Sequence, residues 1–111
     1  MSEETQRLYA QTVALKAEEL IAKYPHITRL PLFYGGFLQN TGNHEKAKTF
    51  LEQALETSPD KIQIHWVLAQ NALALGDNES ALRYVEQAAE LAPEYDLAQQ
   101  NLNQIRQQLG Q

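Results

Sequence analysis

Cysteine is absent from this sequence of 111 residues. Disulfides, thiolate nucleophiles and cysteine-based zinc sites are therefore excluded together. Long apolar runs are missing as well, because no stretch approaches the ~18 consecutive apolar residues by which a transmembrane helix is recognised. The acidic start, Met1 to Glu4, leads into no apolar segment of the secretory type, so we expect no signal peptide.

Basic residues are in the minority. Nine lysines and arginines stand against 14 aspartates and glutamates, which gives a net charge of −5. Proteins that bind nucleic acid usually present a basic face, so nucleic acid is not expected as a partner. The apolar share of 43% and the charged share of 21% are ordinary for a folded globular domain.

Glycine and proline are scarce, with five and four residues, and some of them recur at one fixed distance. Four residues return 34 positions later: Gly42, Ala47, Ala54 and Pro59 recur as Gly76, Ala81, Ala88 and Pro93. A fixed period of this size is typical of stacked helical repeats, in which each unit is a pair of antiparallel helices.

Apolar residues at spacings of three and four predict helices on both sides of each turn. We expect an N-terminal capping helix at 2–24, a first repeat at 28–61, a second repeat at 62–95 and a C-terminal capping helix at 96–109. Each repeat holds two helices, and we expect Asp60 to cap the first helix of the second repeat. The predicted fold is all-α, a solenoid of antiparallel hairpins with about six helices.

Spacing and residue types together resemble the tetratricopeptide repeat family. The first repeat has the signature residues Tyr34, Gly35, Leu38, Ala47, Leu51, Ala54 and Pro59. The second repeat has Leu68, Ala69, Ala72, Ala81, Val85, Ala88 and Pro93. Eight of the 34 aligned positions are identical between the repeats. The resemblance implies one domain over 1–111, a right-handed superhelix, and a non-catalytic scaffold that binds a peptide or protein segment in its concave groove.

In this family the first helix of each hairpin lines the concave surface. Carried over by position, the lining here comprises Arg29, Leu32, Gly36, Gln39, Gln63, Trp66, Gln70, Leu73, Leu97, Gln100 and Gln104. Such a surface is apolar and rich in amides with one cation, which suits an extended or helical partner segment. Trp66 either anchors that segment, as tryptophan often does at interfaces, or is buried between helices.

One branch of the family clamps the C-terminal carboxylate of chaperones with several cations. The corresponding positions here carry no cation, so this partner does not fit; they are Leu32, Gly36, Trp66 and Gln70.

Residues for catalysis or metal binding do not gather in the sequence. His26, His44 and His65 are too far apart to be neighbours on one helix. No strand is predicted, so no phosphate-binding loop of the strand–loop–helix kind is expected. We therefore expect neither an enzyme nor a bound metal or cofactor.

Two alternative functions stay open. Ser58 to Ile64 is weakly similar to repeats of bacterial multi-pass envelope proteins of the O-antigen ligase and polymerase type. As a module of such a protein, the domain would lie in the periplasm or elsewhere outside the cytoplasmic membrane. Without that connection the expected compartment is the cytoplasm. The other alternative is self-association through the apolar stripe of an end helix, such as Leu97, Leu102 and Ile105.

Overall fold

The protein was analysed as a computed structural model, which describes residues 2–94 and 96–110 apart from the side chains of residues 97, 98 and 101. Over the described residues the chain forms six α-helices and no strand, as predicted. They are α1 (Glu3–Lys23), α2 (Arg29–Asn40), α3 (His44–Thr57), α4 (Ile62–Ala74), α5 (Asn78–Leu91) and α6 (Asp96–Gln108). None of these helices is long and apolar enough to cross a membrane.

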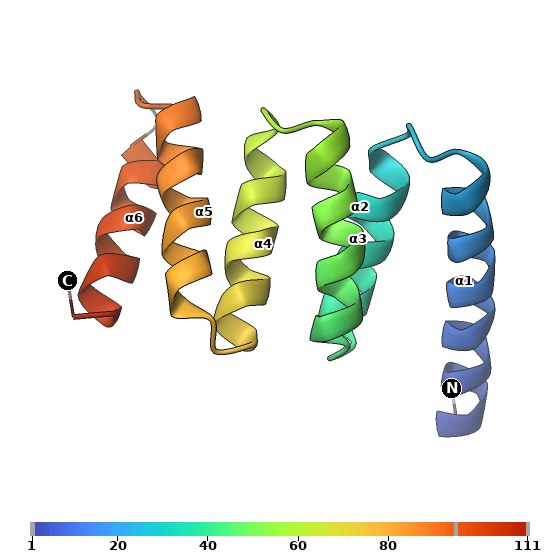
Figure 1. The fold of residues 1–111 in the computed structure, drawn as a ribbon. Coiled ribbons are helices and arrows are strands. Elements are labelled where there is room, and N and C mark those ends of the chain that lie inside the picture. Colours follow the sequence, from blue (N-terminus) through green and yellow to red (C-terminus); the bar gives the residue numbers. More distant parts are fainter. Residues whose placement is uncertain (1, 95, 111) are drawn as a thin grey trace.

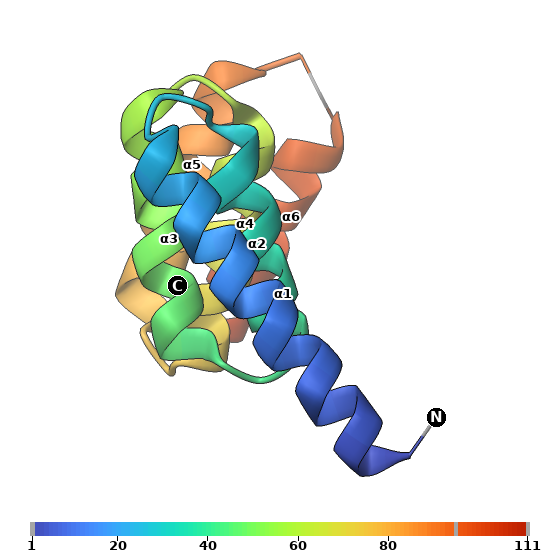
Figure 2. The ribbon, with the colours of Figure 1, turned by 90° about the vertical axis from the view of Figure 1, so that its right-hand side faces the viewer.

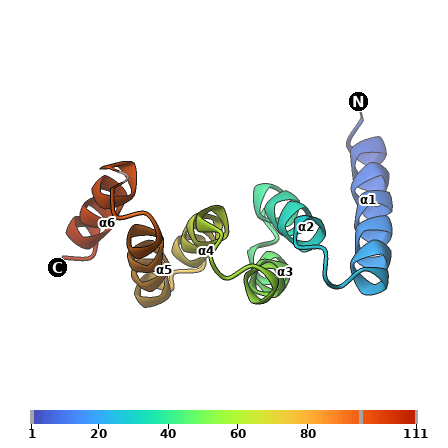
Figure 3. The same ribbon diagram turned by 90° about the horizontal axis from the view of Figure 1, so that it is seen from above.

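The helices stand side by side in a row, with α1 at one end and α6 at the other (Figure 1). The most extensive contacts lie within the pairs α2–α3 and α4–α5, which are the two predicted hairpins. Seen from above, α2, α4 and α6 form one layer, and α3 and α5 form the other (Figure 3). The molecule is consequently elongated, with extents of 44 × 31 × 21 Å.

The tight turn inside each hairpin depends on a glycine. Gly42 and Gly76 have φ angles of +89° and +79°, in the left-handed region that favours glycine. The following N–H groups, of Asn43 and Asp77, each donate to a carbonyl five residues earlier at 2.8 Å. This pattern ends a helix by satisfying carbonyls that have no partner within it. The 34-residue recurrence of glycine therefore has a backbone cause.

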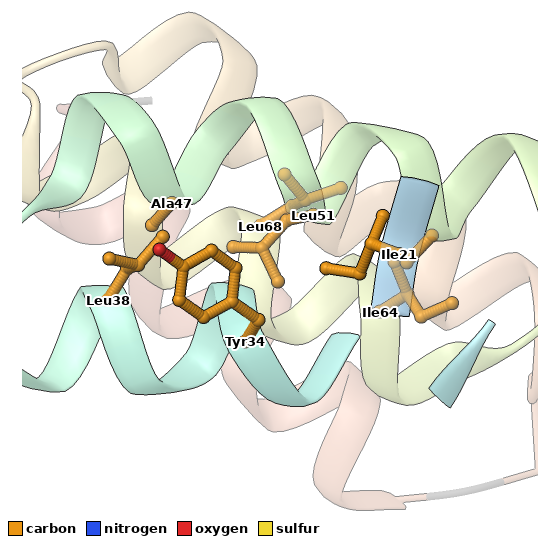
Figure 4. Close-up of a cluster of buried hydrophobic side chains, with 8 residues drawn as sticks. Ile21, Tyr34, Leu38, Ala47, Leu51, Ile64 and Leu68 are labelled. Carbon is orange, nitrogen blue, oxygen red and sulfur yellow. The ribbon is translucent and has the colours of Figure 1, made fainter. Parts of the chain in front are cut away.

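The two helices of the first hairpin approach closely because small residues face the crossing. A β-carbon built at Gly35 would lie 2.7 Å from the side chain of Leu51 on α3. Ala47 and Ala54, also on α3, are completely buried. Figure 4 shows the resulting apolar cluster, in which Tyr34 lies among side chains of neighbouring helices. Gly35 therefore allows close packing of α2 against α3.

The connection from α3 to α4 differs from its prediction. Asp60 does not cap α4, because the residue before the helix is Lys61, which makes no side-chain capping bond. The turn is held instead by His65, whose Nε2 lies 2.8 Å from the Pro59 carbonyl. Thr28 precedes α2 but its hydroxyl bonds that of Ser58, at 2.7 Å. The Thr28–Ser58 bond joins the α1–α2 and α3–α4 connections, which lie at the same end of the molecule, whereas the His65–Pro59 bond is local.

The N-terminal helix α1 is attached mainly through its C-terminal half. Ile21 is buried in the core that α2, α3 and α4 share. The Lys46 ammonium donates to the Glu18 carboxylate at 2.9 Å, and this hydrogen bond raises the pKa of Lys46. The N-terminal half of α1 projects beyond the other helices (Figure 2).

Two adjacent glycines of α2 allow a matched test of the close packing. Gly35→Ala would place a methyl group against Leu51, whereas Gly36→Ala meets nothing within 4 Å. Alanine is preferred to glycine in a helix by about 1 kcal/mol, so Gly36→Ala should raise the free energy of unfolding. Overpacking should make Gly35→Ala about 1–3 kcal/mol less stable than Gly36→Ala. Urea unfolding followed by circular dichroism measures the stability of both variants. Equal stabilities would contradict the close approach of α2 and α3 at Gly35.

Candidate binding groove

A cleft of about 600 Å³ lies between α2 and α4, in the layer formed by the first helices of the hairpins. It is lined by Leu32, Phe33, Gly36, Phe37, Asn40, Gln63, Trp66, Val67 and Gln70. The absence of a side chain at Gly36 leaves open space at this surface. Aromatic and aliphatic groups therefore form the wall, with amide side chains among them.

A second cleft, of about 240 Å³, continues on the other side of α4 towards α6. Its lining is Trp66, Ala69, Gln70, Leu73, Val85, Gln104, Ile105 and Gln108. Trp66 and Gln70 border both clefts, so the two are continuous across α4.

A third cleft, of about 430 Å³, lies where α2 and α4 begin. It is lined by Thr28, Arg29, Leu32, Ser58, Lys61 and Gln63, of which Leu32 and Gln63 also border the first cleft. We call the three connected clefts the groove. It runs across the layer of α2, α4 and α6 that Figure 3 shows.

Trp66 occupies the junction of the groove. The side chain is half-buried and packs against the small core cluster of Ala69, Val85, Ala89 and Leu102. The same residue also borders two clefts. One portion of Trp66 thus packs against the core and another borders the groove, and its role as an anchor stays a prediction.

Carboxylates are excluded from the groove. Among the described residues that line its three clefts, none is acidic, and the cations are Arg29 and Lys61. Acidic residues are instead exposed on the second helices of the hairpins, for example Glu52 on α3 and Glu90 on α5. A chain of net charge −5 therefore presents a neutral to basic surface on this side.

Most residues carried over from the family pattern lie in the groove. They are Arg29, Leu32, Gly36, Gln63, Trp66, Gln70, Leu73 and Gln104. Gln39 does not line a cleft, because its Nε2 lies 3.5 Å from the Val67 carbonyl and bridges α2 to α4. Gln100 is exposed on α6 away from the clefts. The side chain of Leu97 is outside the described residues.

Sequence reasoning missed part of the lining. Phe33 is 75% exposed and borders the first cleft, although it was not among the residues carried over from the family pattern. The available signal was its spacing, since Phe33 follows Arg29 by four residues and precedes Gly36 by three. Lys61 was missed because its side chain reaches the groove from the turn before α4.

No group of three or more metal-binding side chains occurs among the described residues. The ring of His65 has a structural partner, and His44 takes part in a bond through its backbone. The Nε2–H group of His65 donates to the Pro59 carbonyl, and the His44 carbonyl accepts from the Asn71 amide at 2.8 Å. Asn71 is 99% buried at this contact, so the bond ties α4 to the start of α3.

The family model of the tetratricopeptide repeat matches residues 27–94, which is more than half of the chain. The chain belongs to the tetratricopeptide repeat family. Among solved structures, the chain is similar to the crystal structure of MamA protein, with a TM-score of 0.77 at 15% sequence identity. The match covers 96% of this chain and 60% of the MamA chain, and it shows the fold alone. No curated protein sequence matches the chain.

The family model places the chain among tetratricopeptide repeat proteins, which typically serve as protein-interaction scaffolds. The hairpins of this chain supply the layer of α2, α4 and α6 on which the groove lies.

The surroundings of Trp66, the single tryptophan, can be tested by fluorescence. We expect acrylamide to quench it to an intermediate degree, because the ring is half-buried. Iodide should quench it more strongly than caesium, since the groove holds cations and no described carboxylate. Stern–Volmer constants at constant ionic strength, with free N-acetyltryptophanamide as the reference, measure both effects. Stronger quenching by caesium would contradict the charge pattern.

Proposed function

We propose that this protein is a binding scaffold that holds a segment of a partner protein in the groove, with Trp66 as the anchor. The observation that carries the proposal is the position of Trp66, half-buried at the junction of two clefts. Aromatic residues that are fixed by packing and border a pocket are the type that dominates protein interfaces. Because the ring is already held by the core, little side-chain entropy is lost on binding.

The polar groups of the groove favour a peptide backbone as the ligand. Gln63, Gln70 and Gln104 each carry an amide that donates and accepts hydrogen bonds, which matches the N–H and C=O groups of a partner segment. Leu32 and Phe37 supply apolar wall for its side chains. The pattern suits a segment in which apolar residues alternate with groups that can bond to amides.

Charge favours acidic residues at one end of this segment. Arg29 and Lys61 border the cleft at the start of α2 and α4 without a described carboxylate among its lining residues. Aspartate or glutamate of the partner would find opposite charge there, whereas lysine and arginine would be repelled. Each such exposed ion pair contributes about 0–1 kcal/mol, so the effect is on orientation and rate more than on affinity.

Affinity capture tests the proposal most directly. The wild-type protein, Trp66→Ala and the matched control Tyr24→Ala are immobilised and exposed to lysate of the source cells, and bound proteins are identified by mass spectrometry. Tyr24 is an exposed aromatic that does not line the groove. We expect a partner that wild type and Tyr24→Ala retain and Trp66→Ala loses. Titration with the partner's binding segment should show a loss of about 2 kcal/mol, roughly 30-fold in affinity. Equal recovery by a normally helical Trp66→Ala would refute the anchor.

Reversing the charges of Arg29 and Lys61 tests the orientation in which the partner segment binds. Arg29→Glu combined with Lys61→Glu should weaken binding of an acidic segment by up to about 2 kcal/mol in low salt, and less in high salt. A double variant of cations on the layer of α3 and α5, Lys48→Glu with Arg83→Glu, changes the net charge equally and touches none of the three clefts. If both double variants lose affinity to the same extent, the effect comes from net charge and not from the groove.

A further inference from the structure

A further apolar cleft lies between α1 and α2, adjoins the groove at Arg29 and Phe33, and has a volume of about 530 Å³. We call it the end cleft. Its lining is Tyr9, Thr12, Val13, Lys16, Ala17, Leu20, Arg29, Leu30, Phe33 and Tyr34. Lys16 and Arg29 are its charged residues, and the other side chains are mostly apolar.

The internal repeat indicates that a helix is the kind of element that fits the end cleft. Val13, Ala17 and Leu20 stand 34 residues before Ala47, Leu51 and Ala54, which lie on the face of α3 that α2 covers. The same face of α1 is covered by no helix among the described residues, and it borders the end cleft instead. A helix packed against this face would repeat the contact that α2 makes with α3.

Exposed apolar side chains gather at this end of the molecule. Tyr9 is 64% exposed and Phe33 is 75% exposed. The opposite end is different, since α6 presents Asn103, Gln107 and Gln108 to solvent while Leu102 is buried against the helices. Solenoid ends need a polar outer surface to remain in water. The described part of α6 provides such a surface, whereas α1 adds the exposed Leu8, Tyr9 and Leu15 to its polar residues.

We infer that the end cleft is a self-association surface, in which α1 of a second copy of this chain packs antiparallel against α1 across a two-fold axis. Val13 is the midpoint of α1 and would lie at the axis. Tyr9 of each copy then meets Ala17 of the other, so a large side chain faces a small one at both symmetric contacts. Such a self-complementary surface is what a two-fold dimer requires.

Charge distinguishes a second copy from an unrelated helix. The first turn of α1 carries Glu3 and Glu4, and its last turn carries Lys23. Antiparallel pairing about Val13 places Glu3 of each copy next to Lys23 of the other, with Arg29 nearby at the same end of the cleft. Parallel pairing would instead bring like charges together at both ends. The chain therefore carries both the apolar surface and the complementary charges for its own partner.

The oligomeric state is measured first. Sedimentation equilibrium of the full chain from micromolar to millimolar concentration should give a mass that rises from 12.6 kDa towards twice that value. Val13→Glu should raise the dissociation constant by at least about tenfold, because it buries like charges on the axis. The control Leu91→Glu changes an exposed apolar residue of α5, outside the groove and the end cleft, and should leave the dimer unchanged. A wild-type mass of 12.6 kDa at every concentration overturns the inference.

Cross-linking locates the interface independently of affinity. The chain has no cysteine, so each substitution introduces a single reactive thiol. Val13→Cys should form a covalent dimer with a short bismaleimide, because two residues at a two-fold axis lie close together. Leu15→Cys is the control, since Leu15 is 71% exposed and points away from the end cleft on the same helix.

More cross-linking at Leu15→Cys than at Val13→Cys, with both variants helical, would exclude this face of α1. Charge exchange then tests the direction of pairing. Glu3→Lys and Lys23→Glu should each weaken dimerisation, and the combined variant should recover part of the loss. A combined variant weaker than both single variants would contradict the antiparallel arrangement.

Discussion

Close approach of the two helices in each hairpin is the constraint on which the other features depend. Gly35 removes the side chain where α2 crosses Leu51 of α3, and the position 34 residues later holds the small, buried Ala69. Ala47 and Ala81 are completely buried on the facing helices. With small residues at this crossing, the two helices of each hairpin pack closely and the hairpins can stack. Larger side chains there would separate the helices, and the core would lose dispersion contacts.

Stacking of such units separates the chain into two surfaces with different chemistry. The layer of α2, α4 and α6 carries apolar and amide side chains, and the layer of α3 and α5 carries exposed glutamates (Figure 3). Fixing the first helices in one layer brings together residues that are about one repeat apart in sequence. Leu32, Trp66 and Gln104 thereby contribute to one continuous groove. A binding role follows from this arrangement more naturally than a chemical one.

The two ends of the helical stack differ in how they close the core and in the surface they present to solvent. At the C-terminal end, α6 buries Leu102 and exposes amides, so it closes the core and meets water with a polar surface. At the N-terminal end, α1 is held by Ile21 and by the Lys46–Glu18 pair, and its first half carries exposed Leu8 and Tyr9. The groove and the end cleft share Arg29 and Phe33, so two binding events would take place on adjoining surfaces of α2.

The sequence by itself determined the repeat and its turns. Gly42 and Gly76 recur because a left-handed residue is needed to end a helix there, and this local requirement is visible without coordinates. The buried alanines recur for an equally local reason, since a fixed spacing along a helix selects one face. The family positions also indicated most of the groove lining, including Trp66 and Gln63.

Only the tertiary structure decided the points that depend on residues distant in sequence. Gln39 has the amide side chain expected of a groove residue, but its Nε2 group faces the Val67 carbonyl of α4. Asp60 has the chemistry of a cap, but the His65–Pro59 bond shapes that turn and places Lys61 before α4. The end cleft likewise depends on how α1 lies against α2, a contact to which the buried Ile21 contributes. Each of these outcomes is a competition between contacts across the fold, and the periodicity of one helix carries no information about them.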